Sequence, residues 1–192
     1  MKQDTKNILI ETGAQIIHHK GYNHTGIQEV LKAAGVPKGS FYFHFKNKED
    51  FGLQVIEYFD GIYFSMLSTI INNNDITPLK KIEEITNYYI SFFKEIDFKC
   101  GCPVGNLSQE MGDLNSAFSE KLTNSVEKMA KIYQNILDEA KLINEINEEI
   151  NTQELSEFIV SSWHGALIKM KINKNAKPLE LHKKFVLEIL KK

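Results

Sequence analysis

The chain has 192 residues, 42% of them hydrophobic and 25% charged, with a formal net charge of −2, which is the composition of an ordinary soluble globular protein. It contains no apolar run near the length of about 20 residues that spans a bilayer, and its N-terminus lacks the apolar segment of a signal peptide. Only two cysteines, Cys100 and Cys102, are present, so a disulfide framework is excluded and we expect a cytoplasmic protein with no membrane partner.

Charge is unevenly distributed along the chain. Residues 1–50 contain seven lysines and five acidic residues, a net charge of +2, whereas the remainder has a net charge of −4. A mildly basic end on an acidic body suits a protein that presents that end to phosphate groups. The chain has no arginine, the residue that most often reads guanine, so base contacts must come from Lys, Gln, Ser, His or Tyr.

Two helices are predicted in the first 35 residues. A helical pattern runs from Thr5 to Lys20 and stops at Gly21, a residue type that commonly ends helices. A second helix is predicted to open at Thr25, with Gln28 at capping-box spacing. It ends at Gly35, which tolerates a positive φ. Its apolar stripe, with i, i+3, i+4 and i+7 spacing, is Ile27, Val30, Leu31 and Ala34.

A short third helix is predicted over about residues 38–45, directly after a proline. Phe41 and Phe45 are four residues apart and can therefore pack inward together, against the stripe of the second helix. Asn47 is then a typical N-cap, since acidic residues follow it in the first turn. The fourth helix is predicted to continue from there to about Ile71.

The rest of the chain is also predicted to be helical. We expect four or five more helices, including a segment punctuated by Gly and Pro from Gly101 to Asp113. The approximate bounds of the clear helices are Leu79–Phe98, Ser116–Leu142, Thr152–Ile172 and Pro178–Lys192. No strand alternation or internal repeat is evident, so the predicted fold class is all-α, with about nine helices.

Residues 25–46 have the layout of a helix-turn-helix, in which the second helix of the motif enters the major groove of DNA. Lys38 and Lys48 flank that helix and can contact phosphates. The backbone N–H groups of Gly39 and Ser40 lie at its start, where a phosphate can also bind. The motif therefore predicts a DNA-binding end.

Other polar residues of the motif have two interpretations. Tyr42 and His44 offer hydrogen-bonding groups to phosphate or base, although a lone histidine is as easily a surface residue. Thr25 is a further phosphate candidate, and Gln28 is either a cap or a base reader. A helical hairpin inside a bundle would show the same apolar stripe, but rings, cations and hydroxyls gathered on one short helix favour DNA. The candidate DNA-binding residues are Thr25, Gln28, Lys38, Gly39, Ser40, Tyr42, His44 and Lys48.

Cys100 and Cys102 lie in the Gly/Pro-punctuated segment, with Pro103 directly after the second thiol. A thiol near a helix start is expected to have a lowered pKa and greater reactivity. The alternative is that both thiols are small buried hydrophobic groups. We expect no metal site, because no second Cys/His pair has suitable spacing, and no disulfide, because the ring would be very small. We also expect no cofactor.

The remaining aromatic residues either line a ligand cavity or, more often for rings at helical spacing, form plain core. They include Tyr63, Tyr88, Phe92, Phe118 and Trp163. The last two helices each carry a further stripe suited to a dimer interface. On one helix it is Leu155, Ile159, Ser162 and Ala166, and on the other it is Leu181, Phe185 and Ile189.

The segment Gly35-Val-Pro-Lys-Gly-Ser-Phe-Tyr-Phe-His-Phe-Lys-Asn-Lys-Glu-Asp50, with Gly21-Tyr22 and Thr25–Val30 before it, resembles the signature of the TetR family of bacterial transcriptional regulators. The resemblance implies a three-helix DNA-binding domain over residues 1–49 and a helical regulatory and dimerisation domain over 50–192. It implies a homodimer on near-palindromic operator DNA, most often a repressor that a small molecule releases. By position, Lys38, Gly39, Tyr42, His44 and Lys48 match the usual DNA-facing places.

Two further stretches, from Gly101-Cys102-Pro103 to Glu110 and from Trp163 to Ile172, resemble electrophile-sensing repressors that control N-ethylmaleimide reductase. In that comparison Cys102 matches the reactive cysteine and Lys171 a lysine that acts beside it. The sensor or ligand candidates are Cys102, Lys171 and Trp163.

The predicted function is a DNA-binding transcriptional regulator, not an enzyme, released from its operator by a small molecule or thiol-reactive electrophile. A thiol redox enzyme using Cys100 and Cys102 is an alternative, but it leaves residues 25–48 unexplained. A helical interaction module without DNA binding is another, and it explains only the periodicity.

Overall fold

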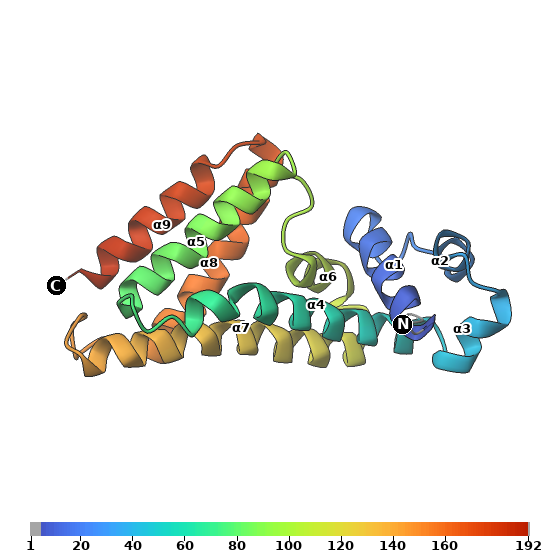
Figure 1. Ribbon diagram of the computed structural model, residues 1–192, viewed down its shortest axis with the longest axis horizontal. Coiled ribbons are helices and arrows are strands. Elements are labelled where there is room, and N and C mark those ends of the chain that lie inside the picture. The colour runs from blue at the N-terminus through green and yellow to red at the C-terminus, as the bar shows by residue number, and fades with distance from the viewer. Residues whose placement is uncertain (1–4, 192) are drawn as a thin grey trace. The chain divides into compact units, whose positions relative to one another are not determined.

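The computed structural model describes residues 5–191, and every regular element in that range is an α-helix (Figure 1). The helices are α1 Thr5–Lys20, α2 Ile27–Ala34, α3 Lys38–His44, α4 Lys48–Ile71, α5 Pro78–Glu95, α6 Pro103–Met111, α7 Ser116–Leu142, α8 Thr152–Asn173 and α9 Lys177–Leu190. The all-α prediction is confirmed over this range. Across these same residues, none of the helices combines the length and the apolar character that a membrane crossing requires.

The start of α2 differs from the prediction. Gly26, not Thr25, is the N-cap, and no side chain caps the helix. The hydroxyl of Thr25 instead donates to the backbone oxygen of Gly21 at 2.7 Å, so it closes the loop before the helix. At the other end Gly35 has φ +65°, as expected, and the N–H groups of Gly35 and Val36 donate to carbonyls of the last turn.

The segment between α5 and α6 also departs from the expected bounds. The fifth helix stops at Glu95, before Phe98, because Asp97 and Phe98 have φ values of 53° and 54° and cannot continue a right-handed helix. A short helix, α6, forms within the Gly/Pro-punctuated segment from Gly101 to Asp113, where the sequence analysis includes a helix.

The chain forms two compact units. The first comprises residues up to Phe64 together with Pro103–Ser125, and the second comprises Ser65–Cys102 and the residues from Val126 onward. Since α4 and α7 each contribute residues to both units, the division does not coincide with the boundary at residue 50 that the sequence indicates.

In the first unit, α3 is held by an aromatic cluster. The buried rings of Phe41, Phe45 and Phe51 lie with centroids 5.0–5.4 Å apart. Phe41 of α3 and Phe45, the residue directly after α3, therefore pack on the first turn of α4. Gly13 of α1 lies against the same cluster, because a Cβ added there would stand 2.2 Å from Cζ of Phe51. This cluster fixes the rotation of α3.

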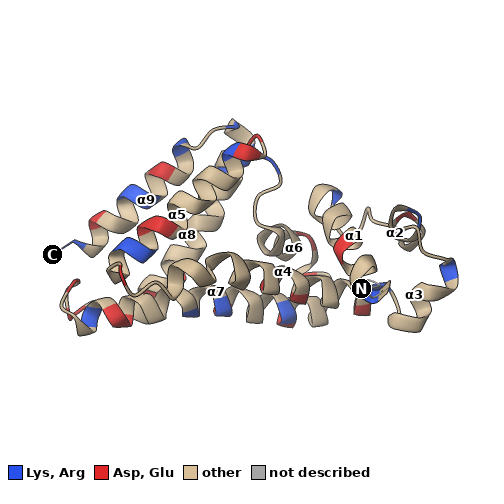
Figure 2. Ribbon diagram, viewed as in Figure 1, with Lys and Arg blue, Asp and Glu red and all other residues tan. Residues whose placement is uncertain are grey.

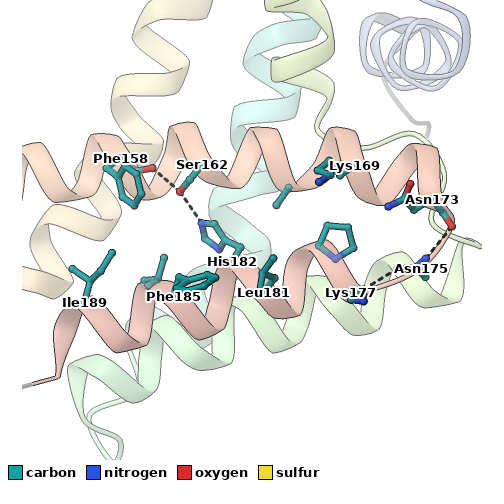
Figure 3. Close-up of a pocket in the computed structure, with 13 residues that line it drawn as sticks. Phe158, Ser162, Lys169, Asn173, Asn175, Lys177, Leu181, His182, Phe185 and Ile189 are labelled. Carbon is teal, nitrogen blue, oxygen red and sulfur yellow. Dashed lines mark hydrogen bonds between the residues drawn. The ribbon is translucent and has the colours of Figure 1, made fainter.

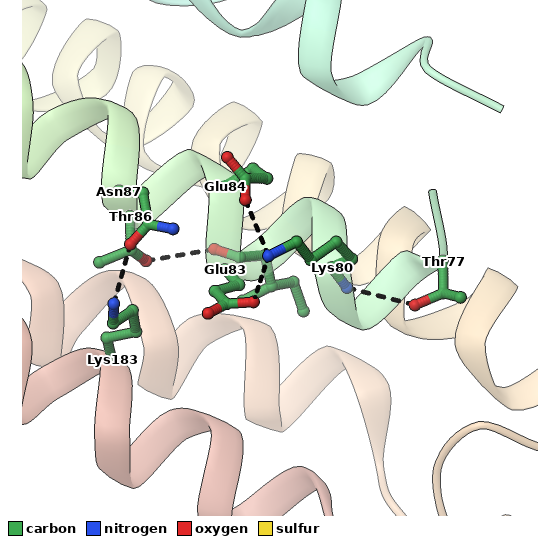
Figure 4. A network of polar contacts seen from close by, with 8 residues as sticks. Thr77, Lys80, Glu83, Glu84, Thr86, Asn87 and Lys183 are labelled. Carbon is green, nitrogen blue, oxygen red and sulfur yellow. Dashed lines mark hydrogen bonds and ion pairs between the residues drawn. The ribbon is translucent and has the colours of Figure 1, made fainter. Parts of the chain in front are cut away.

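In the second unit, α5 packs with α9 and α9 with α8 (Figure 1). Lys183 of α9 donates to Asn87 of α5 at 2.8 Å, next to the ion pairs that Lys80 makes with its own helix (Figure 4). Lys81, only 3% exposed, donates to Glu139 of α7 at 3.0 Å. The polar contacts therefore tie together helices that are distant in sequence.

We expect Gly13→Ala to lower the free energy of unfolding by about 1–2 kcal/mol, since overpacking costs more than the helix propensity of alanine returns. The matched control is Gly61→Ala in α4, where a Cβ meets nothing within 4 Å; we expect it to be neutral or to stabilise by up to about 1 kcal/mol. Urea unfolding of both variants measures the difference. Equal midpoints would contradict the close contact with Phe51.

Candidate functional site

The outer face of α3 is the first candidate site. Because Phe41 and Phe45 point into the core, the residues between them point away, and Tyr42 is 59% and Phe43 85% exposed. Lys38 and Gly39, in the first turn, are also exposed. Exposed aromatic rings on a seven-residue helix add little to the packing of the protein itself, and such surfaces commonly bind a partner. This face is accessible to a large partner.

The structure presents most of the predicted DNA-binding residues at the surface. Gln28 on α2 is exposed, and Ser40, His44 and Lys48 are half-buried. Thr25 is the exception, since it is 2% exposed and its hydroxyl is engaged with Gly21. In this structure it therefore supports the loop instead of facing a phosphate.

Phe43 is a surface residue that the sequence reasoning did not select. Its ring meets only the neighbouring ring of His44, edge to face, at 5.0 Å among the described aromatic contacts. The helical period predicts its outward orientation, because Phe43 lies half a turn from both inward phenylalanines. A phenyl ring has neither a charge nor a hydrogen-bonding group, the properties that most of the candidate residues share.

Lys48 is held against the loop between α1 and α2. Its Nζ lies 4.3 Å above the ring centroid of Tyr22, a cation–π contact. Burial lowers the pKa of Lys48, and the charge of Glu110 opposes that shift. Burial, with the charges of Glu49 and Glu110, raises the pKa of Tyr22 to about 12. The ammonium group of Lys48 is therefore held in place by the ring of Tyr22.

Several lysines of the first unit remain exposed to solvent. A basic residue stands at the start of α3, and both signs of charge occur along α7 and α9 (Figure 2). Lys32 and Lys46 are exposed beside the helix-turn-helix, whereas Lys20 forms an ion pair with Glu29 of α2. The basic character of this end is therefore carried by a few lysines around α3.

The segment before α6 is the second candidate site. Asp97, Phe98, Cys100 and Gly101 all have φ between 53° and 77°, the left-handed region that non-glycine residues rarely adopt. Such backbone strain is frequent at functional segments. Both thiols are half-buried and free of disulfide, and Cys102 directly precedes the first residue of α6. Within residues 5–191 no cluster of three His, Cys, Asp or Glu could hold a metal ion.

Cys102 lies within electrostatic reach of Tyr89 on α5. Burial raises the pKa of the Tyr89 phenol above its ordinary range, with further contributions from the charges of Tyr133, Cys102 and Tyr88. The ring of Tyr89 in turn lies 5.6 Å from that of the buried Trp163. Two of the three sensor candidates, Cys102 and Trp163, are thus gathered around Tyr89.

Lys171, the third sensor candidate, is exposed in the last turn of α8. It stands about 12 Å along the helix from Trp163. Lys171 is therefore about two helical turns away from the contact between the rings of Tyr89 and Trp163.

The third feature is an open groove of about 670 Å³ along α8 and α9 (Figure 3). Phe158, Leu181, Phe185 and Ile189 line it and are each about half exposed. At its floor, Nε2 of His182 lies 3.1 Å from the hydroxyl oxygen of Ser162. Burial lowers the pKa of His182, an effect that its hydrogen bond to the Ile159 carbonyl opposes.

The predicted α9 stripe of Leu181, Phe185 and Ile189 is confirmed as a surface stripe. On α8 the prediction was wrong for Ile159, which is 1% exposed and part of the core. Phe158, its neighbour, faces the groove instead. Ile159 belongs to the core of the second unit, whereas Ser162 and Ala166 of the same predicted stripe line the groove.

Two protein-family models match the chain. The model of "Bacterial regulatory proteins, tetR family" matches residues 9–55, which include α2 and α3. The model of "Tetracyclin repressor-like, C-terminal domain" matches residues 78–186, more than half of the chain.

Relatives match nearly the full length. The chain is 32% identical over 182 residues to the HTH-type transcriptional repressor DhaR of Mycobacterium sp. strain GP1, covering 95% of this chain and 90% of DhaR. It is 28% identical over 183 residues to the HTH-type transcriptional repressor NemR of Escherichia coli K12, covering 93% and 90%. The crystal structure of E. coli NemR in its reduced form has a TM-score of 0.85 at 26% identity over 97% of both chains.

We expect Lys38→Ala to weaken binding to duplex DNA and to reduce the slope of log affinity against log salt by about 1, because one phosphate contact is lost. The control is Lys131→Ala, an exposed lysine of the second unit. Fluorescence anisotropy at several salt concentrations measures both slopes. An unchanged slope for Lys38→Ala would place this lysine outside the phosphate contacts.

Proposed function

Because the chain belongs to the TetR family of bacterial DNA-binding transcriptional regulators, we propose that it is a dimeric repressor that leaves its operator when Cys102 reacts with an electrophile or oxidant. DNA binding belongs to the family. The residues, the dimer and the inducer are our inferences from the geometry. Both named relatives are transcriptional repressors, which favours this function over a thiol redox enzyme or an interaction module.

The observation that carries the DNA-binding assignment is the orientation of α3. The helix buries Phe41 and Phe45 and leaves Tyr42 and Phe43 open to solvent. A helix held in this way can enter a major groove with its exposed residues facing the base edges. The first-turn N–H groups and Lys38 would then meet phosphates and fix the register.

Because the chain has no arginine, other exposed side chains must contact the base edges. Gln28 can contact an adenine edge, and Tyr42 offers a hydroxyl. The exposed ring of Phe43 can contact only apolar groups, of which the thymine methyl is the one in the major groove. We therefore propose an operator containing A·T pairs opposite α3 in each half-site, arranged as a near-palindrome for a two-fold dimer.

The groove on α8 and α9 is the proposed dimer interface. Four half-exposed large apolar side chains on one face are a common mark of an interface. A second copy related by a two-fold axis would place α8 and α9 of both chains in a four-helix bundle, the assembly that the family resemblance implies.

Cys102 is the proposed inducer site. It precedes the first turn of α6, where the helix dipole stabilises a thiolate, and the strained backbone of residues 97–101 adjoins it. The thiolate would attack an α,β-unsaturated carbonyl, forming a C–S bond, while the resulting enolate takes a proton from water. A bulky adduct at the half-buried thiol cannot fit without moving its neighbours, and this displacement would bias the chain away from DNA. The resemblance also assigns Lys171 a role beside the reactive thiol.

The direct test of the function is binding to DNA upstream of its own gene. We expect specific, salt-sensitive binding that mutation of one half-site weakens. Binding that is equal for the upstream DNA and for scrambled DNA would contradict the repressor assignment.

We expect N-ethylmaleimide to weaken operator binding by the wild-type protein by about tenfold or more, a typical size for allosteric coupling. Cys102→Ser should retain its affinity after the same treatment, since its hydroxyl is not alkylated. Cys100→Ser is the matched control and should respond as the wild type does. Release of Cys102→Ser by the reagent would contradict the sensor assignment.

We expect Phe185→Glu to convert a dimer into a monomer, because a carboxylate would be buried without a partner in the apolar interface. The mass from light scattering should fall to the 22.1 kDa of one chain. Leu142→Glu, which places the same charge at an exposed residue outside the groove, should leave the dimer intact. A dimeric Phe185→Glu would rule out this groove as the interface.

A further inference from the structure

Glu110, near the end of α6, binds the loop between α1 and α2. Its carboxylate accepts two hydrogen bonds from consecutive backbone N–H groups, those of Tyr22 at 2.8 Å and Asn23 at 2.7 Å. The distances are typical of charge-assisted hydrogen bonds. This contact joins two segments that are 87 and 88 residues apart in sequence.

The loop is shaped to receive this carboxylate. Gly21 has φ +89°, and a Cβ at that position would lie 2.8 Å from Oε2 of Glu110, so a larger residue would meet both backbone strain and a clash. The side-chain amide of Asn23 also donates to the sulfur of Met111, the next residue of α6, at 3.4 Å. Three consecutive loop residues, Gly21, Tyr22 and Asn23, therefore contact the C-terminal end of α6.

The loop also bears on the DNA-facing residues. It carries the buried ring of Tyr22, which packs on Phe118 at 4.7 Å and supports the ammonium group of Lys48. The loop leads directly into α2, the helix against which α3 packs. The position of this loop therefore sets the position of the start of α2 and of the ammonium group of Lys48.

We propose that Glu110 is a positioning residue that fixes the α1–α2 loop to α6, so that the pose of α2 and α3 follows any displacement of α6. α6 begins at the residue after Cys102 and ends one residue after Glu110. This inference rests on the proposed function. Through the contact between Glu110 and the loop, modification of Cys102 would change the position of the DNA-binding helices.

A purely structural role for Glu110 is the competing explanation, because Tyr22 and Phe118 also hold the loop. The two explanations predict different effects when the carboxylate of Glu110 is removed. A structural contact alone contributes stability, whereas a positioning contact also sets operator affinity and its response to alkylation.

The test uses full-length Glu110→Gln, in which one amide hydrogen bond is lost because the new NH₂ group opposes a backbone donor. Before alkylation we expect operator affinity to fall by about fivefold or more, and the further loss on N-ethylmaleimide treatment to shrink toward onefold. Glu49→Gln is the control, since it removes the same charge near Tyr22 from a carboxylate that binds Asn115, not the loop. It should match the wild type in both measurements, and mass spectrometry should show equal modification of Cys102 in all three proteins.

Hydrogen exchange of the wild type provides a second measurement that needs no variant to fold. The amides of Tyr22 and Asn23 should be protected in the unmodified protein and lose protection on alkylation, while the α1 amides keep theirs. Unchanged protection of both amides, or a Glu110→Gln that behaves like Glu49→Gln, overturns the inference. If alkylation leaves operator binding of the wild type unchanged, the sensor proposal fails, and positioning is decided by the affinities of the unmodified variants.

Discussion

The burial of three phenylalanines is the constraint on which the DNA-binding end depends. Phe41, Phe45 and Phe51 form one cluster that fixes the rotational setting of α3, because turning the helix would break the ring contacts of Phe41 and expose it to water. The cost of that choice is the exposure of Tyr42 and Phe43 on the opposite side. Function at this end therefore follows from packing, since the core decides which residues are free to contact another molecule.

A reading face without arginine relies on weaker and more distributed interactions. Lysine is a point charge that contacts phosphate well but lacks the planar fork that reads guanine in two bonds. In the proposed function, direct readout would rest on Gln28, Tyr42, Phe43 and lysine, with a larger share left to DNA shape and to the spacing of the half-sites. The modest basic charge of this end is consistent with that balance.

The short helix α6 combines two kinds of chemistry at its two ends. A thiol precedes its first turn and a carboxylate stands near its last. Before Cys102, the residues Asp97, Phe98 and Cys100 have positive φ, which non-glycine residues rarely adopt, so this segment has few neighbouring conformations to occupy. A rigid nine-residue helix is well suited to connect two such places.

The sequence alone determined the all-helical fold, most helix bounds and the helix-turn-helix, because caps, glycines and the 3.6-residue period are local properties of the chain. It could not place Glu110 on the loop at Tyr22, gather Cys102, Tyr89 and Trp163, or leave Lys171 outside that group, since these depend on contacts between distant segments. It also placed Ile159 at the surface and Thr25 at a helix cap. In the tertiary structure Ile159 is buried in the core, and the hydroxyl of Thr25 donates to the loop carbonyl of Gly21. The sequence could not decide this, because one apolar stripe or one hydroxyl is compatible with several packing partners, and only the folded chain supplies the actual partner.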